Sequence, residues 1–163
     1  MADREPRASH LSMIDVGEKV PTRRRARALG RIRMSAEAFR ALRDGTNPKG
    51  DVLGQAEVAG LLAAKRTAEV IPLCHPLPLE QVVLRFELEP DSCAVVAFCE
   101  AAATARTGVE MEALSGVCGA LLAIYDLCKA VDPVLTISEV RLQVKEGGKS
   151  GRWVHPAEGE ESK

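Results

Sequence analysis

From Arg25 to Met34 the chain alternates between small or apolar side chains and mainly arginine side chains. Because successive side chains of a β-strand point to opposite faces, this pattern predicts a strand with an apolar face and an arginine face. Similar alternation recurs over residues 82–88 and 134–145. A turn at 90–92 leads from 82–88 into a further strand over 93–103, so these two are expected to pair as a hairpin. An apolar sheet face must be buried, and this requirement constrains the fold strongly.

Three other segments have helical spacing. Ser35 is a typical N-cap for a helix that ends near Arg43. A second helix is expected over 52–66 and a third over Val109–Val131. The order strand, two helices, hairpin, helix, strand is close to the β-α-β-β-α-β order of ferredoxin-like folds. We therefore predict an α+β fold, with a ferredoxin-like antiparallel sheet and helices packed on one face; the other face is expected to be covered in an oligomer.

The length of 163 residues fits one domain. We expect a flexible N-terminal arm over 1–12, a single ferredoxin-like domain over 13–153 and a flexible C-terminal tail over 154–163. The N-terminus lacks the apolar core of a signal peptide, and the longest uncharged stretch, Ala113–Tyr125, is too short to span a bilayer. A cytoplasmic location is therefore expected. The five cysteines form no C-x-x-C motif, so neither a disulfide framework nor a structural zinc site is expected.

Charge is spread unevenly along the chain, although the net charge is only −1. Residues 1–49 carry 12 Lys and Arg against 6 Asp and Glu, whereas residues 50–163 carry 10 against 17. The small net charge gives no overall attraction to nucleic acids or anionic membranes, and aromatic residues, at 3%, offer few platforms for base stacking. The basic part is expected to face an anionic ligand or the acidic part of another subunit.

Two residues in rigid loops are candidates for chemistry. Lys49 lies between a proline and a glycine just before a helix, where it is either a solvated lysine or a cation held for a phosphate or for acid/base work. His75 lies in the segment 71–78, whose three prolines exclude a helix interior and a central strand. The loop holds His75 in a fixed place, as a functional group or as a hydrogen-bonded structural histidine. It has no neighbours at metal-ligand spacing, so no protein metal site is expected.

The long helix carries acidic residues at both ends. Glu110 and Glu112 suit the N-terminal dipole, and stability alone explains them. Asp126 lies in the last turns, where the dipole disfavours an anion, and Lys129 follows at i+3 as a partner. An acid in that position is a candidate for acid/base catalysis. Glu112 and Asp126 share nearly one helix face but are ~21 Å apart along the axis, so a site that uses both requires two subunits.

Six short segments form distinct motifs. They are Pro48-Lys49-Gly50-Asp51, Ala64-Lys65-Arg66-Thr67, Ile71-Pro72-Leu73-Cys74-His75-Pro76-Leu77, Thr107-Gly108-Val109-Glu110-Met111-Glu112-Ala113-Leu114, Tyr125-Asp126-Leu127-Cys128-Lys129-Ala130-Val131-Asp132 and Gly148-Lys149-Ser150-Gly151. In this order, from about Met13 to Trp153, the chain resembles the cyclic pyranopterin monophosphate synthase family, the accessory protein C of molybdenum cofactor biosynthesis. It departs from the family at Gly17, where a serine is expected, and at Arg106, where a lysine is common.

The resemblance implies a ferredoxin-like subunit in a homohexamer, built as a trimer of dimers with active sites at subunit interfaces. It also implies a reaction: (8S)-3′,8-cyclo-7,8-dihydroguanosine 5′-triphosphate, made by a radical-SAM GTP 3′,8-cyclase, is rearranged to cyclic pyranopterin monophosphate with release of pyrophosphate. No cofactor is implied, and a need for Mg²⁺ beside the triphosphate stays open. The residues carried over by motif are Lys49, Asp126 and Lys129 as catalytic groups and Leu73, Cys74, His75, Glu110, Met111 and Glu112 around the substrate.

The chemistry of this reaction suggests a role for each side chain. Ring opening and pterin closure need several proton transfers, and the cyclic phosphate needs a sugar hydroxyl to attack the α-phosphorus. We expect Asp126 and Lys129 to be the main acid/base pair, with Lys49 as a second acid/base or a phosphate contact. His75 and Glu112 are expected to hold the guanine-derived ring. The triphosphate is expected to contact cations, namely the arginine face of the first strand, Lys65, Arg66 and Lys149.

Two other functions stay open from the residues alone. A ferredoxin-like RNA-binding module would follow a phosphate backbone with its arginine-rich strand, although that strand carries no aromatic residue and the acidic part of the chain would repel RNA. An inactive homologue would bind the substrate as a regulator or assembly subunit, although Lys49, Asp126 and Lys129 are all present.

Overall fold

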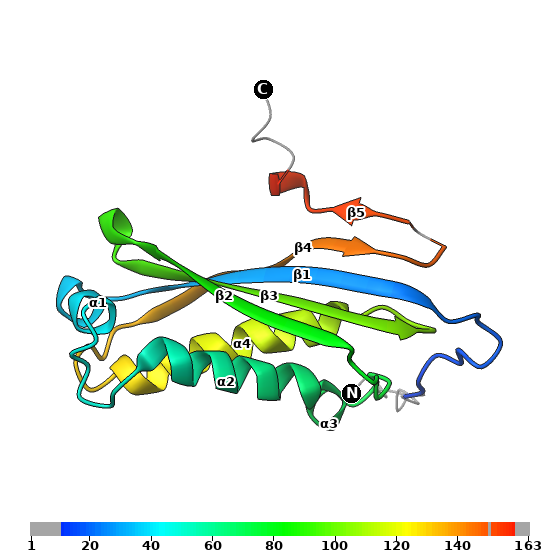
Figure 1. Cartoon of the computed structure of the whole chain (residues 1–163), viewed down its shortest axis with the longest axis horizontal. Coiled ribbons are helices and arrows are strands. Elements are labelled where there is room, and N and C mark those ends of the chain that lie inside the picture. Colours follow the sequence, from blue (N-terminus) through cyan, green and yellow to red (C-terminus); the bar gives the residue numbers. More distant parts are fainter. Residues whose placement is uncertain (1–10, 150, 159–163) are drawn as a thin grey trace, which may run out of the picture.

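The computed structural model describes residues 11–149 and 151–158, which form a sheet with a layer of helices (Figure 1). The five-stranded sheet is antiparallel, in the order β2-β3-β1-β4-β5. Its strands are β1 (Thr22–Arg33), β2 (Gln81–Glu89), β3 (Ala94–Ala105), β4 (Thr136–Glu146) and β5 (Trp153–Val154). The four longer strands have the β-α-β-β-α-β connectivity of a ferredoxin-like fold. The predicted fold class is therefore confirmed.

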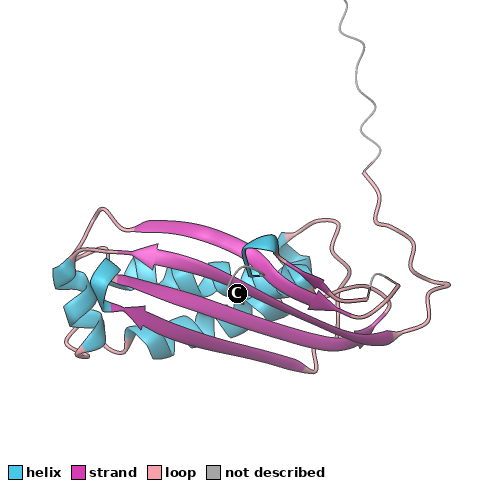
Figure 2. Cartoon of the chain, turned by 90° about the horizontal axis from the view of Figure 1, so that it is seen from above, coloured by secondary structure: helices cyan, strands magenta, loops and turns pink. Residues whose placement is uncertain are grey.

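The helices cover one face of the sheet. Figures 1 and 2 show α2 (Val52–Lys65) and α4 (Glu110–Cys128) side by side on this face, with α1 (Ala36–Arg43) at one end of the molecule. At the other end is α3 (Thr67–Val70). Neither α3 nor β5 is predicted from the sequence, because elements of four and two residues are too short to show a period. Helix α4 ends before the predicted Val131 since the chain turns toward β4, and Pro133 disfavours helical backbone before it.

Strand β1 has the two faces that its alternation predicts. Ala26, Ala28 and Ile32 are fully buried in the core with residues of α4. On the opposite face Arg25 and Arg31 form ion pairs with acids of the hairpin strands. The Arg25 Nη2 lies 2.7 Å from Oε2 of Glu100 on β3, and Arg31 pairs with Glu89 at the end of β2. Part of the arginine face is therefore neutralised within the chain.

Glycines allow α4 to approach both α2 and β1 closely. A Cβ atom at Gly60 of α2 would lie 2.8 Å from the backbone oxygen of Gly116 on α4. A Cβ atom at Gly30 of β1 would lie 2.7 Å from Cγ1 of Val117 on α4. Real Cβ atoms do not come this close, so a larger residue at position 60 would displace the backbone of α4, and one at position 30 would displace the side chain of Val117.

A buried carboxylate fixes the chain after α4 to the start of α1. Asp132 accepts hydrogen bonds from the backbone N–H groups of Val134 (2.9 Å) and Ser35 (2.5 Å). These bonds, led by the one from Val134, lower the pKa of Asp132. Ser35 in turn caps α1 as predicted, because its hydroxyl accepts from the N–H of Ala38 at 3.2 Å.

Among the described residues, α4 is the one helix that is long and apolar enough to cross a membrane. Half of its apolar window is buried inside the protein, where α4 packs between α2 and the sheet. The apolar composition of α4 is therefore explained by its place in the core.

The predicted arm and tail fall largely outside the described residues. Residues 1–10 and 159–163 are not described. Within the predicted tail, Glu158 accepts hydrogen bonds from Arg141 (2.9 Å) and Gln143 (2.8 Å) of β4. The segment up to Glu158 therefore contacts the sheet.

Gly60→Ala is expected to destabilise the fold by about 1–3 kcal/mol, because the new methyl group overlaps the backbone of α4. This loss outweighs the gain of about 1 kcal/mol in helix propensity. Urea unfolding at fixed protein concentration should show a lower midpoint with an unchanged slope. Glu57→Ala, on the exposed side of the same helix, is the control. Equal midpoints for the two variants would contradict the close packing of α2 and α4.

Candidate active site

Three charged side chains meet at the C-terminal end of α4. Asp126 lies in its last turn, Lys129 follows the helix, and Lys49 comes from the turn between α1 and α2. The Nζ of Lys129 lies 2.7 Å from Oδ1 of Asp126, and the Nζ of Lys49 lies 3.2 Å from Oδ2. Lys49 Nζ also donates to the backbone oxygen of Asp126 at 2.8 Å. The structure thus brings the three predicted catalytic residues together, and we name them the lysine–aspartate cluster.

The turn that carries Lys49 is fixed by local backbone geometry. Gly50 has a φ of +86°, a conformation that favours glycine. Asp51 caps α2, since its carboxylate accepts from the N–H of Gly54 at 3.0 Å. Gln55 Nε2 donates to the backbone oxygen of Lys49, also at 3.0 Å. The flexible part of Lys49 therefore starts from a well-defined position.

The cluster carries one negative and two positive charges. The ammonium of Lys129, and then that of Lys49, holds the pKa of Asp126 below its usual range. Asp126 in turn raises the pKa of Lys129. The three side chains are exposed to solvent in the single chain, where ion pairs add little to stability. An exposed cluster of net positive charge suits an anionic ligand and proton exchange with it.

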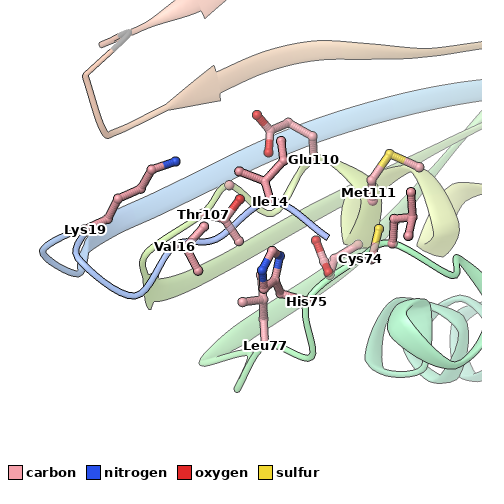
Figure 3. Close-up of a pocket in the computed structure, with 12 residues that line it drawn as sticks. Ile14, Val16, Lys19, Cys74, His75, Leu77, Thr107, Glu110 and Met111 are labelled. Carbon is pink, nitrogen blue, oxygen red and sulfur yellow. The ribbon is translucent and has the colours of Figure 1, made fainter. Parts of the chain in front are cut away.

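A pocket of about 210 Å³ lies at the opposite end of α4 (Figure 3), and we name it the His75 pocket. Figure 3 shows that the proline-rich loop supplies Cys74 and His75, while the start of α4 supplies Glu110 and Met111. Its lining residues are Ile14, Val16, Lys19, Leu73, Cys74, His75, Leu77, Thr107, Gly108, Glu110, Met111 and Glu112. All six residues that the resemblance placed around the substrate line this pocket.

Glu112 is the buried acid of the His75 pocket. Only 4% of it is exposed. Burial raises the pKa of Glu112, and the charge of Glu110 acts in the same direction. Glu110 itself pairs with Lys145 of β4, with 3.2 Å between Oε1 and Nζ. The pKa of the Cys74 thiol is also raised, first by burial and then by Glu112, so Cys74 is a neutral wall of the pocket at neutral pH.

Glu112 also borders a neighbouring pocket of about 310 Å³. This pocket is lined by Lys65 and Thr67 from the end of α2 and the start of α3, and it shares Leu77 with the His75 pocket. Lys65, predicted to contact phosphate, therefore lies next to the His75 pocket.

Arg66 lies elsewhere, in an apolar groove of about 460 Å³ between α2, α3 and α4. The groove contains strongly exposed apolar side chains, notably Val70 (73% exposed) and Leu122 (61%). Its lining residues are Leu62, Ala63, Arg66, Thr67, Val70, Ile71, Met111, Leu114, Ser115, Cys118, Gly119 and Leu122. In the single chain the three predicted phosphate contacts Lys65, Arg66 and Lys149 thus line three different pockets.

A larger pocket of about 740 Å³ adjoins the His75 pocket and shares Lys19, Thr107 and Gly108 with it. We name it the basic pocket, because four cations line it against one carboxylate, Glu18. The four cations are Lys19, Arg24, Arg106 and Lys149. Of these, Lys149 was predicted as a phosphate contact.

Sequence reasoning missed Lys19, Arg24 and Arg106 as lining residues. Arg24 has the same parity on β1 as the buried Ala26 and Ala28, so it is not part of the predicted arginine face. It reaches a pocket because it lies near the start of β1, beyond the buried core. The one available signal was the run of three arginines over 23–25, which places an arginine on each face of the strand.

The predicted catalytic residues and the six residues predicted around the substrate thus form two separate groups within one chain. The lysine–aspartate cluster and the His75 pocket lie at opposite ends of the continuous helix α4, with Glu112 and Asp126 ~21 Å apart along its axis. In the part of the chain that the structure describes, no three His, Cys, Asp or Glu side chains are grouped to hold a metal ion.

Comparison with known proteins gives the family. The model of the MoaC family matches residues 13–148. A curated protein from Chloroflexus aurantiacus, named cyclic pyranopterin monophosphate synthase, is 50% identical over 149 residues, which is 91% of each chain. A protein of the same name from Clostridium botulinum is 49% identical over 143 residues, 88% of this chain and 90% of the other. These matches confirm the resemblance drawn from the motifs, and the chain belongs to the MoaC family.

Proposed function

We propose that this chain converts (8S)-3′,8-cyclo-7,8-dihydroguanosine 5′-triphosphate to cyclic pyranopterin monophosphate and pyrophosphate, an early step of molybdenum cofactor biosynthesis. The observation that carries the proposal is the lysine–aspartate cluster, in which Asp126 lies between two ammonium groups. The names of the two relatives support the same product. An intact cluster also favours an active enzyme over an inactive regulator.

The cluster fits the proton transfers of this reaction. When a sugar hydroxyl attacks the α-phosphorus, a new P–O bond forms and the bond to the departing pyrophosphate breaks. The hydroxyl proton goes to a base, and the carboxylate of Asp126, which lies between the ammonium groups of Lys129 and Lys49, accepts it. The ammonium of Lys129 donates protons to the ring atoms that require them. Lys49 acts as a second acid/base or as a phosphate contact.

The pockets at the other end of α4 fit the two parts of the substrate. The His75 pocket takes the guanine-derived ring, and His75 and Glu112 are two of its polar groups that hold the ring. The adjoining basic pocket takes the triphosphate, because four cations match its charge. Mg²⁺ carried by the triphosphate would enter with the substrate.

Ion pairs within the sheet argue against the RNA-binding alternative. Arg25 is paired with Glu100, and Arg31 with Glu89 and Glu139. A continuous cationic face along β1, which an RNA backbone would need, is therefore lost.

The complete site is proposed to form between subunits, the His75 pocket from one and the lysine–aspartate cluster from its partner. The distance along α4 requires this if both parts serve one substrate. The exposed apolar groove supports burial against another copy. We propose a homohexamer, a trimer of dimers, that acts in the cytoplasm on the product of a radical-SAM GTP 3′,8-cyclase.

Incubation of the purified chain with the cyclic dihydro-GTP should release pyrophosphate and yield the pterin product. Asp126→Asn and Lys129→Ala are each expected to reduce kcat at least 100-fold, because each removes a proton-transfer group. Both variants should keep the wild-type mass in light scattering. Glu87→Ala, at an exposed residue of β2 outside the lysine–aspartate cluster, the His75 pocket and the basic pocket, is the control. A wild-type chain that binds the substrate without turnover would refute the enzymatic proposal.

Asp126→Asn is expected to lower the pKa of Lys129 toward its ordinary value, because a neutral amide no longer stabilises the ammonium. The measurement is an NMR titration of the lysine side chains, with the Lys129 signal assigned from Lys129→Arg. The Lys129 signal of Glu87→Ala, which leaves the cluster intact, is the control. An unaltered titration of Lys129 would contradict the ion pair.

Mixed oligomers test the site between subunits. His75→Ala and Lys129→Ala chains, each inactive alone, are expected to regain up to about a quarter of the wild-type activity after dissociation and reassembly in equal amounts. This follows because some interfaces then combine an intact pocket with an intact cluster. A mixture of Lys49→Ala and Lys129→Ala should stay inactive, since both changes damage the same half. Verified mixed oligomers without activity in the first mixture would rule out the shared site.

A further inference from the structure

Asn47 is a buried polar residue in the turn between α1 and α2, and only 5% of it is exposed. Both ends of its side-chain amide are bonded. Oδ1 accepts from the backbone N–H of Lys49 at 2.9 Å, and Nδ2 donates to the Sγ of Cys128 at 3.7 Å. The amide therefore connects the Lys49 turn to the end of α4.

These bonds close a small ring of contacts around the lysine–aspartate cluster. Cys128 is the last residue of α4, two positions after Asp126, and it is fully buried. From the other side of the ring, Lys49 Nζ reaches both the backbone oxygen and the carboxylate of Asp126. Asn47 thus fixes the backbone of Lys49 against the same helix turn that its side chain contacts.

The chemistry of an amide side chain fits this place. Asn offers a carbonyl acceptor and an NH2 donor group within a few atoms, whereas a carboxylate would lack the donor and an apolar side chain would lack both. Burial of an amide is costly unless both ends are bonded, so its position here depends on both partners. Stability alone does not require the Asn47 amide to bond Cys128, the residue directly before Lys129 of the lysine–aspartate cluster.

We infer that Asn47 is a positioning residue, which holds Lys49 at a fixed place relative to Asp126 by bonding both the Lys49 turn and Cys128. The inference rests on the proposed function only where turnover is measured. Without Asn47 the Lys49 ammonium still reaches Asp126, but from a backbone that has lost one of its anchors.

Asn47→Ala is expected to reduce kcat about 10- to 100-fold with KM within about twofold, because misplacement of a reacting group slows the chemical step. The His75 pocket and the basic pocket, where the substrate binds, are at the other end of α4 and are unchanged. Thr46→Ala, an exposed neighbour in the same turn, is the matched control with wild-type kcat. A change in KM alone would overturn the inference.

A second measurement needs no substrate. Acetic anhydride labelling followed by mass spectrometry gives the acetylation rate of each lysine. In Asn47→Ala the Lys49 amine is expected to react several times faster than in the wild type, whereas Lys129, bonded to Oδ1 of Asp126 independently of Asn47, should react at an unchanged rate. A general loss of structure would accelerate both lysines, so the selective effect identifies positioning. Equal Lys49 rates in the folded variant and the wild type would overturn the inference.

Cys128→Ala keeps the test decisive should Asn47→Ala fail to fold. It removes the sulfur acceptor but leaves the bond between Asn47 and the Lys49 turn, so the same selective change at Lys49 is expected with smaller size. An unchanged Lys49 rate there would equally overturn the inference. If the wild type shows no turnover, the proposed function fails, but the labelling rates still decide the role of Asn47.

Discussion

The close packing of α4 against α2 and β1 determines where the chemical groups of this chain lie. Gly60 of α2 lets the backbones of α2 and α4 approach each other at Gly116, and Gly30 of β1 leaves room for the side chain of Val117 on α4. Hydrogen bonds that the Asp132 carboxylate accepts from the backbone N–H groups of Ser35 and Val134 fix the chain where it leaves the helix. A helix held at its middle and at its exit keeps its two ends in fixed positions. The lysine–aspartate cluster and the His75 pocket lie at those two ends.

Sequence patterns with a period predicted most of this fold. The alternation of β1, the cap at Ser35 and the helical spacing of α4 are local properties, and the structure confirms them. The elements α3 and β5 are only about one period long, so they gave no such signal. Asp126 became a candidate because a helix dipole disfavours an anion at its place, and Lys49 because its turn is rigid; the structure brings the two side chains together.

The residues that sequence reasoning missed are those whose role depends on tertiary contacts. Asn47 looks like an ordinary turn residue, and only the arrival of Cys128 from α4 buries it and bonds its amide. Arg24 is on the same face of β1 as the buried alanines. It lines a pocket only because the loops around residues 106 and 149 lie beside it. The arginine face was easier to see, yet Arg25 and Arg31 are paired with glutamates. Counting cations in the sequence therefore does not show which of them stay available to a ligand.

The fold shifts the pKa values of two carboxyl groups on α4 in opposite directions, and this contrast links the fold to the chemistry. Glu112 lies at the N-terminal end, where the dipole favours an anion, yet burial raises its pKa. Asp126 lies at the C-terminal end, where the dipole disfavours an anion, yet two lysines lower its pKa. Paired acids with separated pKa values are the arrangement by which enzymes assign one group to hold a proton and another to accept one. One chain keeps Glu112 and Asp126 ~21 Å apart along the axis of α4, so these two carboxyl groups can act on one substrate only if two chains supply them.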